Sequence, residues 1–197
     1  MKSPSLAKGT QIALVAVAAF ASFLLPGVAE STAAHQPGQP SQSSPPAAKA
    51  KSRAMLAYEK FKALDGSWQG KSTKGWTERV SYRVIAGGSA VMEMSFDAHP
   101  GEAMATMIHP DGEDLLLTHY CMAKNQPRLR ATDFSEDGKT VTFTFMDATN
   151  LPSRDKGHMD KAVFVFEDAD RFTCQWTWYQ DGKETWMEEI RMERKKR

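Results

Sequence analysis

Apolar and polar residues alternate at every second position in short runs from Asp65 to the C-terminus. The clearest run has Val141, Phe143 and Phe145 interleaved with threonines. Because successive side chains of a strand point to opposite faces, a period of two predicts strands that are apolar on one face. Ten segments fit this pattern and are predicted as strands: 66–73, 76–85, 89–97, 103–109, 114–122, 128–134, 140–146, 161–167, 171–179 and 183–194.

Turn signals separate these segments at Gly87-Gly88, Asp111-Gly112, Asp137-Gly138 and Asp181-Gly182. Short turns join antiparallel neighbours, and ten strands connected in this way close into an up-and-down barrel. The predicted fold class is therefore all-β, an up-and-down antiparallel β-barrel of about ten strands with a short N-terminal helix. That helix is predicted over residues 53–64, where apolar residues recur at helical spacing, and it either lies on the barrel or plugs one end.

The alternation also predicts which faces point into the barrel. We expect two inward faces, Phe172/Cys174/Trp176/Trp178 and Trp76/Val80/Tyr82/Val84. On the strand over 89–97, Met92, Met94 and Phe96 alternate with Val91, Glu93 and Ser95. Together with other methionines on or beside strands, they suggest an interior rich in Met. Such an interior either packs solidly or accommodates a ligand of loosely defined shape.

The N-terminus has the three-part layout of a secretory signal peptide. Lys2 and Lys8 precede an apolar run over residues 12–25, and a site of small residues follows at 27–29. That run is shorter than the roughly 20 residues that span a bilayer as a helix. We expect cleavage after Ala29 and export to the periplasm or the medium, with no stable membrane span in the mature protein.

Residues 30–52 are rich in Pro, Ser, Ala and Gln and contain almost nothing apolar to bury, so we expect a disordered linker. Residues 53–197 are then a single barrel domain. The whole chain has 25 basic and 24 acidic residues. A nearly neutral domain with mixed charges has no basic stripe for nucleic acid, so we expect no nucleic-acid partner.

His119 and Cys121 share one face of their predicted strand with Leu115 and Leu117. If that face is inward, an imidazole and a thiol enter the barrel together and could serve a ligand or a nucleophilic reaction. The alternative is a hydrogen-bonded core histidine beside a small apolar cysteine. Cys121 and Cys174 fall on strands that are not neighbours, which favours two buried free thiols over a disulfide.

Two connections hold polar side chains at a possible barrel mouth. Asn125, Gln126 and Arg128 suit a carboxylate or another polar ligand group, or they tie the backbone of the turn. The longest connection, residues 147–160, contains Asn150 and His158 and is a lid, an entrance or a plain surface loop.

Motifs for catalysis are missing from the sequence, which favours a non-catalytic role. It contains no Gly-rich phosphate loop, nucleophile elbow or zincin motif. The histidines and cysteines are scattered, so no metal site is predicted.

The motif Gly66-Ser67-Trp68 on the first strand, an antiparallel meander and a late arginine resemble the lipocalin and calycin plan. The resemblance implies that Trp68 closes one end of the barrel and that Arg191 or Arg194 packs across its ring, with Arg191 as our choice. The segments 119–121, 125–128, 147–151, 157–159 and 176–179 resemble exported bacterial lipocalin-like proteins that have no assigned activity.

A more distant similarity is to nitrobindins, haem-binding barrels that open with Gly-x-Trp-x-Gly-x-Gly. This chain keeps Gly66, Trp68 and Gly70 but has Ser72 in place of the last glycine. The similarity implies haem as a possible cofactor, with His158 or His119 as its ligand.

Three functions follow from these expectations. The first is an exported binding protein that holds a small, mostly apolar molecule in the barrel. The second is a haem-binding barrel, and the third is a solid barrel that acts as an interaction module. The candidate ligand-binding residues for the first function are His119, Cys121, Asn125, Gln126, Arg128, Asn150, His158, Trp176 and Trp178.

Overall fold

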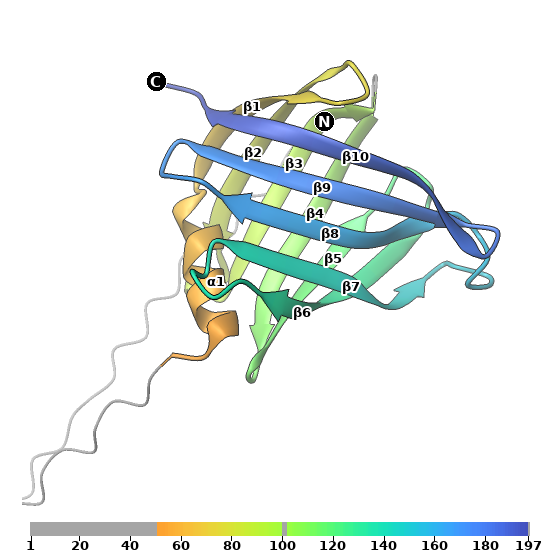
Figure 1. The fold of residues 1–197 in the computed structure, drawn as a ribbon, viewed down its shortest axis with the longest axis horizontal. Coiled ribbons are helices and arrows are strands. Elements are labelled where there is room, and N and C mark those ends of the chain that lie inside the picture. The colour runs from red at the N-terminus through yellow and green to blue at the C-terminus, as the bar shows by residue number, and fades with distance from the viewer. Residues whose placement is uncertain (1–50, 100–101, 197) are drawn as a thin grey trace, which may run out of the picture. The chain divides into compact units, whose positions relative to one another are not determined.

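The computed structural model describes residues 51–99 and 102–196. The predicted signal peptide and nearly all of the predicted linker lie outside these residues. The described elements are α1 (Arg53–Ala63), the 3₁₀ turn η1 (Ala86–Gly88), β1 (Gly66–Ser72), β2 (Thr77–Ile85), β3 (Ala90–His99), β4 (Glu102–Asp111), β5 (Asp114–Tyr120), β6 (Gln126–Phe134), β7 (Thr140–Thr149), β8 (His158–Phe166), β9 (Arg171–Gln180) and β10 (Lys183–Arg194) (Figure 1).

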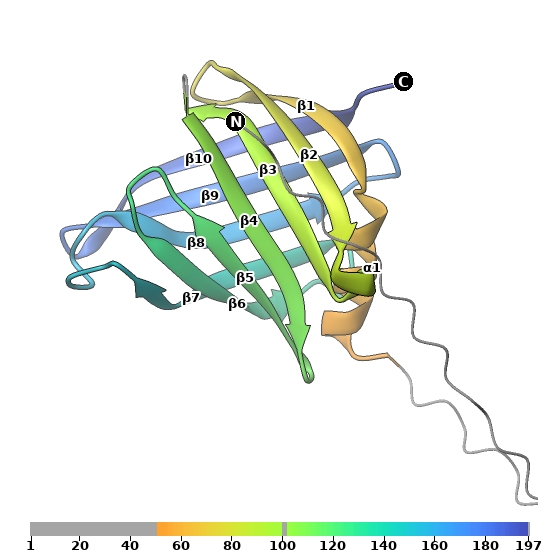
Figure 2. The same cartoon turned by 180° about the vertical axis from the view of Figure 1, so that it is seen from behind.

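The ten strands form a closed barrel in which each strand pairs antiparallel with the next and β1 pairs with β10. Figures 1 and 2 show the two sides of this wall, with β9 and β10 in front in one view and β2 to β4 in the other. The predicted fold class is confirmed. The largest differences in bounds are at β7 and β8, which each extend three residues into the predicted 147–160 connection. The loop between them therefore spans only residues 150–157.

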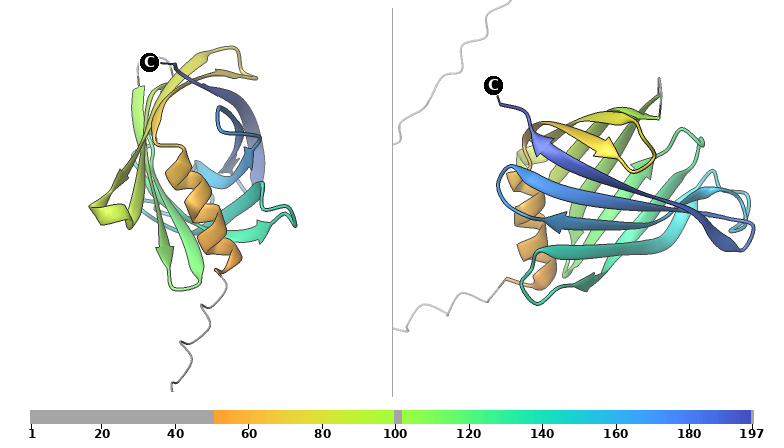
Figure 3. Two further views of the ribbon diagram at one scale, coloured as in Figure 1. Left: turned by 90° about the vertical axis from the view of Figure 1, so that its left-hand side faces the viewer. Right: turned by 45° about the horizontal axis from the view of Figure 1, so that its top comes forward.

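The helix α1 lies across one end of the barrel (Figure 3). It begins after Ser52, whose hydroxyl accepts a hydrogen bond from the backbone N–H of Met55 at 3.3 Å. Ala54, Ala57, Tyr58 and Phe61 form its buried face. Leu56, one of the apolar positions in the predicted helical pattern, is instead 51% exposed.

Phe61 anchors the helix in the barrel. Its ring makes edge-to-face contacts with Phe143, Phe164 and Phe166, at centroid distances of 6.0, 5.0 and 5.1 Å. The hydroxyl of Tyr58 donates to the carbonyl oxygen of Gly88 at 2.9 Å. This packing fills the helix end of the barrel, so any internal space must lie farther along the barrel axis.

Trp68 is 1% exposed, and its indole N–H donates to the carbonyl oxygen of Leu64 at 2.8 Å. The guanidinium carbon of Arg194 lies 4.3 Å from the Trp68 ring centroid. The choice of Arg191 as the closing arginine was therefore wrong. Arg194 pairs with Trp68 across β1 and β10, whereas Arg191 pairs with Lys71 on the opposite face, and 80% of its side chain is exposed.

Gly70 allows β1 and β10 to approach closely. A β-carbon at this position would overlap the Met192 sulfur and would lie 2.8 Å from the Arg191 carbonyl oxygen. Both approaches are far closer than van der Waals contact, so only glycine fits here without displacement of β10.

On β3, the face that points into the barrel is not the Met-rich face that the sequence suggested. Val91, Glu93 and Ser95 are the buried positions, while Phe96 is 45% exposed and Met92 and Met94 are half-buried. On β2, Val80 and Tyr82 are buried as expected, but Val84 is 36% exposed and Glu78 is buried in its place on the inner face. The inward positions of Phe172, Cys174 and Trp176 on β9 are confirmed.

Candidate functional site

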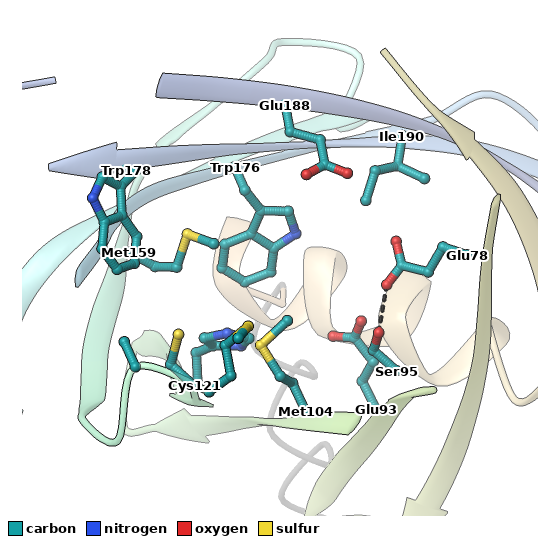
Figure 4. A pocket seen from close by; sticks show the side chains of 13 residues that line it. Glu78, Glu93, Ser95, Met104, Cys121, Met159, Trp176, Trp178, Glu188 and Ile190 are labelled. Carbon is teal, nitrogen blue, oxygen red and sulfur yellow. Dashed lines mark hydrogen bonds between the residues drawn. The ribbon is translucent and has the colours of Figure 1, made fainter. Parts of the chain in front are cut away.

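The barrel contains a cavity of about 470 Å³. The β5–β6 turn forms part of its wall, and the remaining wall comes from strands on both sides of the barrel (Figure 4). The lining residues are Glu78, Glu93, Ser95, Met104, His119, Cys121, Met122, Ala123, Met159, Trp176, Trp178, Glu188 and Ile190. The cavity is mostly apolar but contains three carboxyl groups and an imidazole.

The carboxyl groups of this cavity lie toward one side, together with Ile190, and most of the other apolar residues lie toward the opposite side. In Figure 4, Glu78, Glu93, Ser95 and Glu188 gather at one side, which we call the acidic end. Trp178, Met159 and Cys121 lie at the other side, with the Trp176 ring between the two groups. Such an arrangement suits a molecule with one polar end and an apolar body.

Glu78 and Glu93 are almost completely buried, at 4% and 7% exposure. The Ser95 hydroxyl donates to Oε1 of Glu78 at 2.6 Å, but Oε2 of Glu78 and Oε2 of Glu93 have no hydrogen-bond partner in the protein. Burial raises the pKa of Glu78 to about 7 and that of Glu93 to about 8, and the charge of Glu188 adds to the rise at Glu78. Glu93 therefore holds its proton at neutral pH, and Glu78 is about half ionised.

His119 lies in a row of buried polar residues that crosses three strands. Glu93 on β3 is opposite Thr106 on β4, which is opposite His119 on β5. The Thr106 hydroxyl lies 3.0 Å from Nδ1 of His119 and also forms a hydrogen bond with Glu93. Burial lowers the pKa of His119 to about 4, so the imidazole is neutral.

The second ring nitrogen of His119 is available to a ligand. His119 is 5% exposed and lines the cavity, and its Nε2 has no hydrogen-bond partner in the protein. Thr106 has one proton to donate. If that proton goes to Glu93, the Thr106 oxygen accepts from Nδ1–H of His119, and Nε2 presents a lone pair. This assignment applies when Glu93 is ionised and accepts from Thr106.

Four of the nine residues predicted to bind a ligand line the cavity, namely His119, Cys121, Trp176 and Trp178. The inward face predicted for His119 and Cys121 is confirmed. The sequence reasoning missed Glu78, Glu93 and Glu188. The alternation of the strands could have identified two of them as inward-facing, because Glu78 is in phase with Val80 and Glu93 is in phase with Val91.

The other polar candidates tie the loops together and do not line the cavity. Asn125 donates from its amide to the Gly157 carbonyl oxygen at 2.9 Å. Oε1 of Gln126 accepts from the Asn150 amide at 2.9 Å. Arg128 forms an exposed ion pair with Asp147 on the neighbouring strand. The sequence left two roles open for Asn125, Gln126 and Arg128, ligand binding or tying the backbone together. In the structure these side chains bond to neighbouring loops and strands.

His158 is fully buried, but it does not line the cavity. Its Nδ1 lies 2.5 Å from the Lys156 carbonyl oxygen, and its Nε2 is hydrogen-bonded to Arg154. The Arg154 guanidinium lies 4.4 Å from the Phe145 ring centroid and 3.9 Å from that of Tyr179. Because both ring nitrogens are engaged, His158 is not placed to ligate haem in the cavity.

Both cysteines are buried and free, as the sequence favoured. Burial raises the pKa of Cys121 and raises that of Cys174 well above its usual value, so neither is an activated thiolate. Within residues 51–99 and 102–196, no three His, Cys, Asp or Glu side chains are grouped so that they could hold a metal ion. No helix among these residues is long and apolar enough to cross a membrane.

Comparisons with known proteins assign no family. No family model and no curated protein matches the chain. Among solved structures, it is similar to a protein of unknown function from the DUF3598 family of Nostoc punctiforme, with 10% sequence identity and a TM-score of 0.46. The similarity covers 68% of this chain and 48% of that one, so the chain spans about half the length of that protein. At these values the similarity carries no argument about function.

Proposed function

We propose that this protein is an exported, lipocalin-like binding protein that holds a small, mostly apolar ligand in its barrel and has no catalytic activity. The observation that supports the proposal is the cavity at one side of the packed aromatic core. A volume of about 470 Å³ is within the usual range for small-molecule sites, which is roughly 300–1,000 Å³.

The chemistry of the wall also favours a carrier over a solid interaction module. Met104, Met122 and Met159 provide flexible, polarisable contacts, and Trp176 and Trp178 provide broad apolar faces. A solid barrel would place such side chains in contact with one another.

Haem fits this cavity poorly. His119 has a ring nitrogen without a partner, as an axial ligand requires. However, haem carries two propionates, and the same cavity is lined by three carboxyl groups with no Lys or Arg among its described lining residues. Like charges at close range are unfavourable in a buried site, so we do not propose haem as the ligand.

A neutral fluorescent probe, N-phenyl-1-naphthylamine, tests the proposal. We expect its emission to rise on binding to the purified protein and to fall when an apolar competitor is added. Ala123 lines the cavity from an exposed turn, so Ala123→Trp should obstruct the cavity without disturbing the core. Glu136→Trp, on an exposed turn that does not line the cavity, is the matched control. A probe that does not bind, or that binds equally to both variants, would refute the proposal.

A further inference from the structure

The cavity contains three buried polar atoms without a hydrogen-bond partner in the protein, two of them at the acidic end. Oε2 of Glu78, Oε2 of Glu93 and Nε2 of His119 are all buried and have no partner in the protein. All three residues line the cavity and are more than nine-tenths buried. Unsatisfied buried polar atoms are costly, so a ligand that brings N–H donors to the ionised carboxyls gains hydrogen bonds there.

The acidic end also lacks positive charge. Glu188 on β10 lies opposite Trp176 on β9 and lines the cavity together with Glu78 and Glu93. None of the described residues that line the cavity is Lys or Arg. Carboxyl groups from β2, β3 and β10 therefore converge on one space without a cationic side chain there, and each raises the cost of ionising the others.

Resting on the proposed function above, we propose that the ligand is a lipophilic amine, whose ammonium group lies among Glu78, Glu93 and Glu188 and whose apolar body lies along Trp176 toward Trp178. A primary ammonium has three N–H donors and no acceptor, which complements the acceptors of the acidic end. Figure 4 shows the apolar side chains at the opposite end, where an alkyl or aryl body is buried.

A carboxylate ligand does not fit the same space. It would place a fourth acidic group beside three carboxyls, and the neutral His119 offers no positive charge to offset it. An alcohol fits sterically but brings one donor and no charge. The acidic end therefore ranks ligands of equal length as amine, then alcohol, then carboxylate.

The preference is expected to depend on pH. The titratable groups around the two central carboxyls are Tyr82 on β2, Asp97 on β3, His119 on β5, Cys174 on β9 and Glu188 on β10. Asp97 is half-buried and paired with Arg79, and that pairing lowers the pKa of Asp97. Tyr82 and Cys174 have raised pKa values and His119 a lowered one, so all three are neutral between pH 6 and 8. The glutamates thus set the charge of the cavity in this range.

Glu78 and Glu93 ionise between pH 6 and 8. An alkylamine stays protonated over this range, because its pKa is close to the value of about 10.4 for the lysine ammonium. Amine binding should therefore tighten as the pH rises from 6 to 8 and should release protons from the carboxyls below pH 8. Binding of an uncharged ligand should change little over the same range.

The test compares decylamine, decanol and decanoate as competitors of N-phenyl-1-naphthylamine on the purified protein. At pH 7.5 we expect decylamine to bind at least tenfold more tightly than decanol, with decanoate weakest. In the double variant Glu78→Gln/Glu93→Gln, which keeps the side-chain size, the amine-to-alcohol ratio should fall to about threefold or less. Glu136→Gln, an exposed carboxyl outside the cavity, should leave the ratio unchanged.

Titration calorimetry in two buffers of different ionisation enthalpy should show proton release with decylamine and none with decanol. An amine that binds no better than the alcohol, or a preference that survives in the double variant, would overturn the amine proposal. Probe binding to the wild-type protein reports separately on the cavity. The amine proposal can thus fail while the carrier function stands, and loss of probe binding in the wild-type protein would remove both.

Discussion

Replacing Glu93 by Gln should weaken the dependence of stability on pH. Glu93 ionises at a pKa near 4.5 in the unfolded chain and at about 8 in the folded protein. Between these values the folded state binds a proton that the unfolded state has released, so stability falls as the pH rises. The favourable contribution is fully present below pH 4.5 and is lost by about pH 8.

The magnitude follows from the two pKa values. Each pH unit between them costs at most about 1.4 kcal/mol, which gives a loss of about 3 kcal/mol from pH 5 to pH 8. The amide of the Glu93→Gln variant cannot ionise, so that variant should lose about 3 kcal/mol less than the wild type over this range. Glu78, whose pKa is raised to about 7, adds a smaller fall that both proteins share.

Urea unfolding followed by tryptophan fluorescence at pH 5, 6, 7 and 8 measures this difference. The exposed Glu136→Gln is the matched control and should reproduce the wild-type slope. If Glu93→Gln falls as steeply with pH as the wild type, Glu93 is not the buried proton-binding group described here.

Three further predictions concern the barrel itself. Gly70→Ala should lower the free energy of unfolding by about 1–3 kcal/mol, because the alanine β-carbon would overlap β10. Thermal unfolding should show a correspondingly lower Tm for this variant. Arg194→Ala removes the contact with the Trp68 ring and hydrogen bonds to three backbone carbonyls, so chemical denaturation should show a loss of about 2 kcal/mol. Arg191→Ala, at an exposed position, should cost under about 0.5 kcal/mol, and an equal loss in both variants would contradict the assignment. The two buried cysteines should resist a thiol reagent in the folded protein, and both should react in denaturant without a reductant; fewer than two reactive thiols would indicate a disulfide.

The barrel could be predicted from sequence because its main signal is local. Val141 and Phe143 alternate with threonines over a single strand, and such a pattern fixes strand type without knowledge of any neighbour. Short turns then fixed the order of pairing along the chain. The inward face of β5 with His119 stayed conditional at the sequence level, because Leu116 makes the opposite face apolar as well; the structure buries His119 with Leu115 and Leu117.

The acidic end could not be predicted in this way. Glutamate is usually solvated, so alternation alone does not predict that a glutamate in phase with buried apolar residues, such as Glu78 with Val80, lines a cavity. Burial of Glu188 depends on β10 meeting strands that are far from it in sequence. The choice between Arg191 and Arg194 likewise depends on the register of β1 against β10, which is set only when the barrel closes.

Native mass spectrometry of the protein, purified under gentle conditions, tests the central claim most directly. The account predicts an adduct of a few hundred daltons that leaves on denaturation, whose mass and fragmentation identify an apolar molecule with a basic nitrogen. Protein that carries no adduct, and whose thermal stability is unchanged by added amines, alcohols and lipids, would contradict the claim that the cavity binds a ligand.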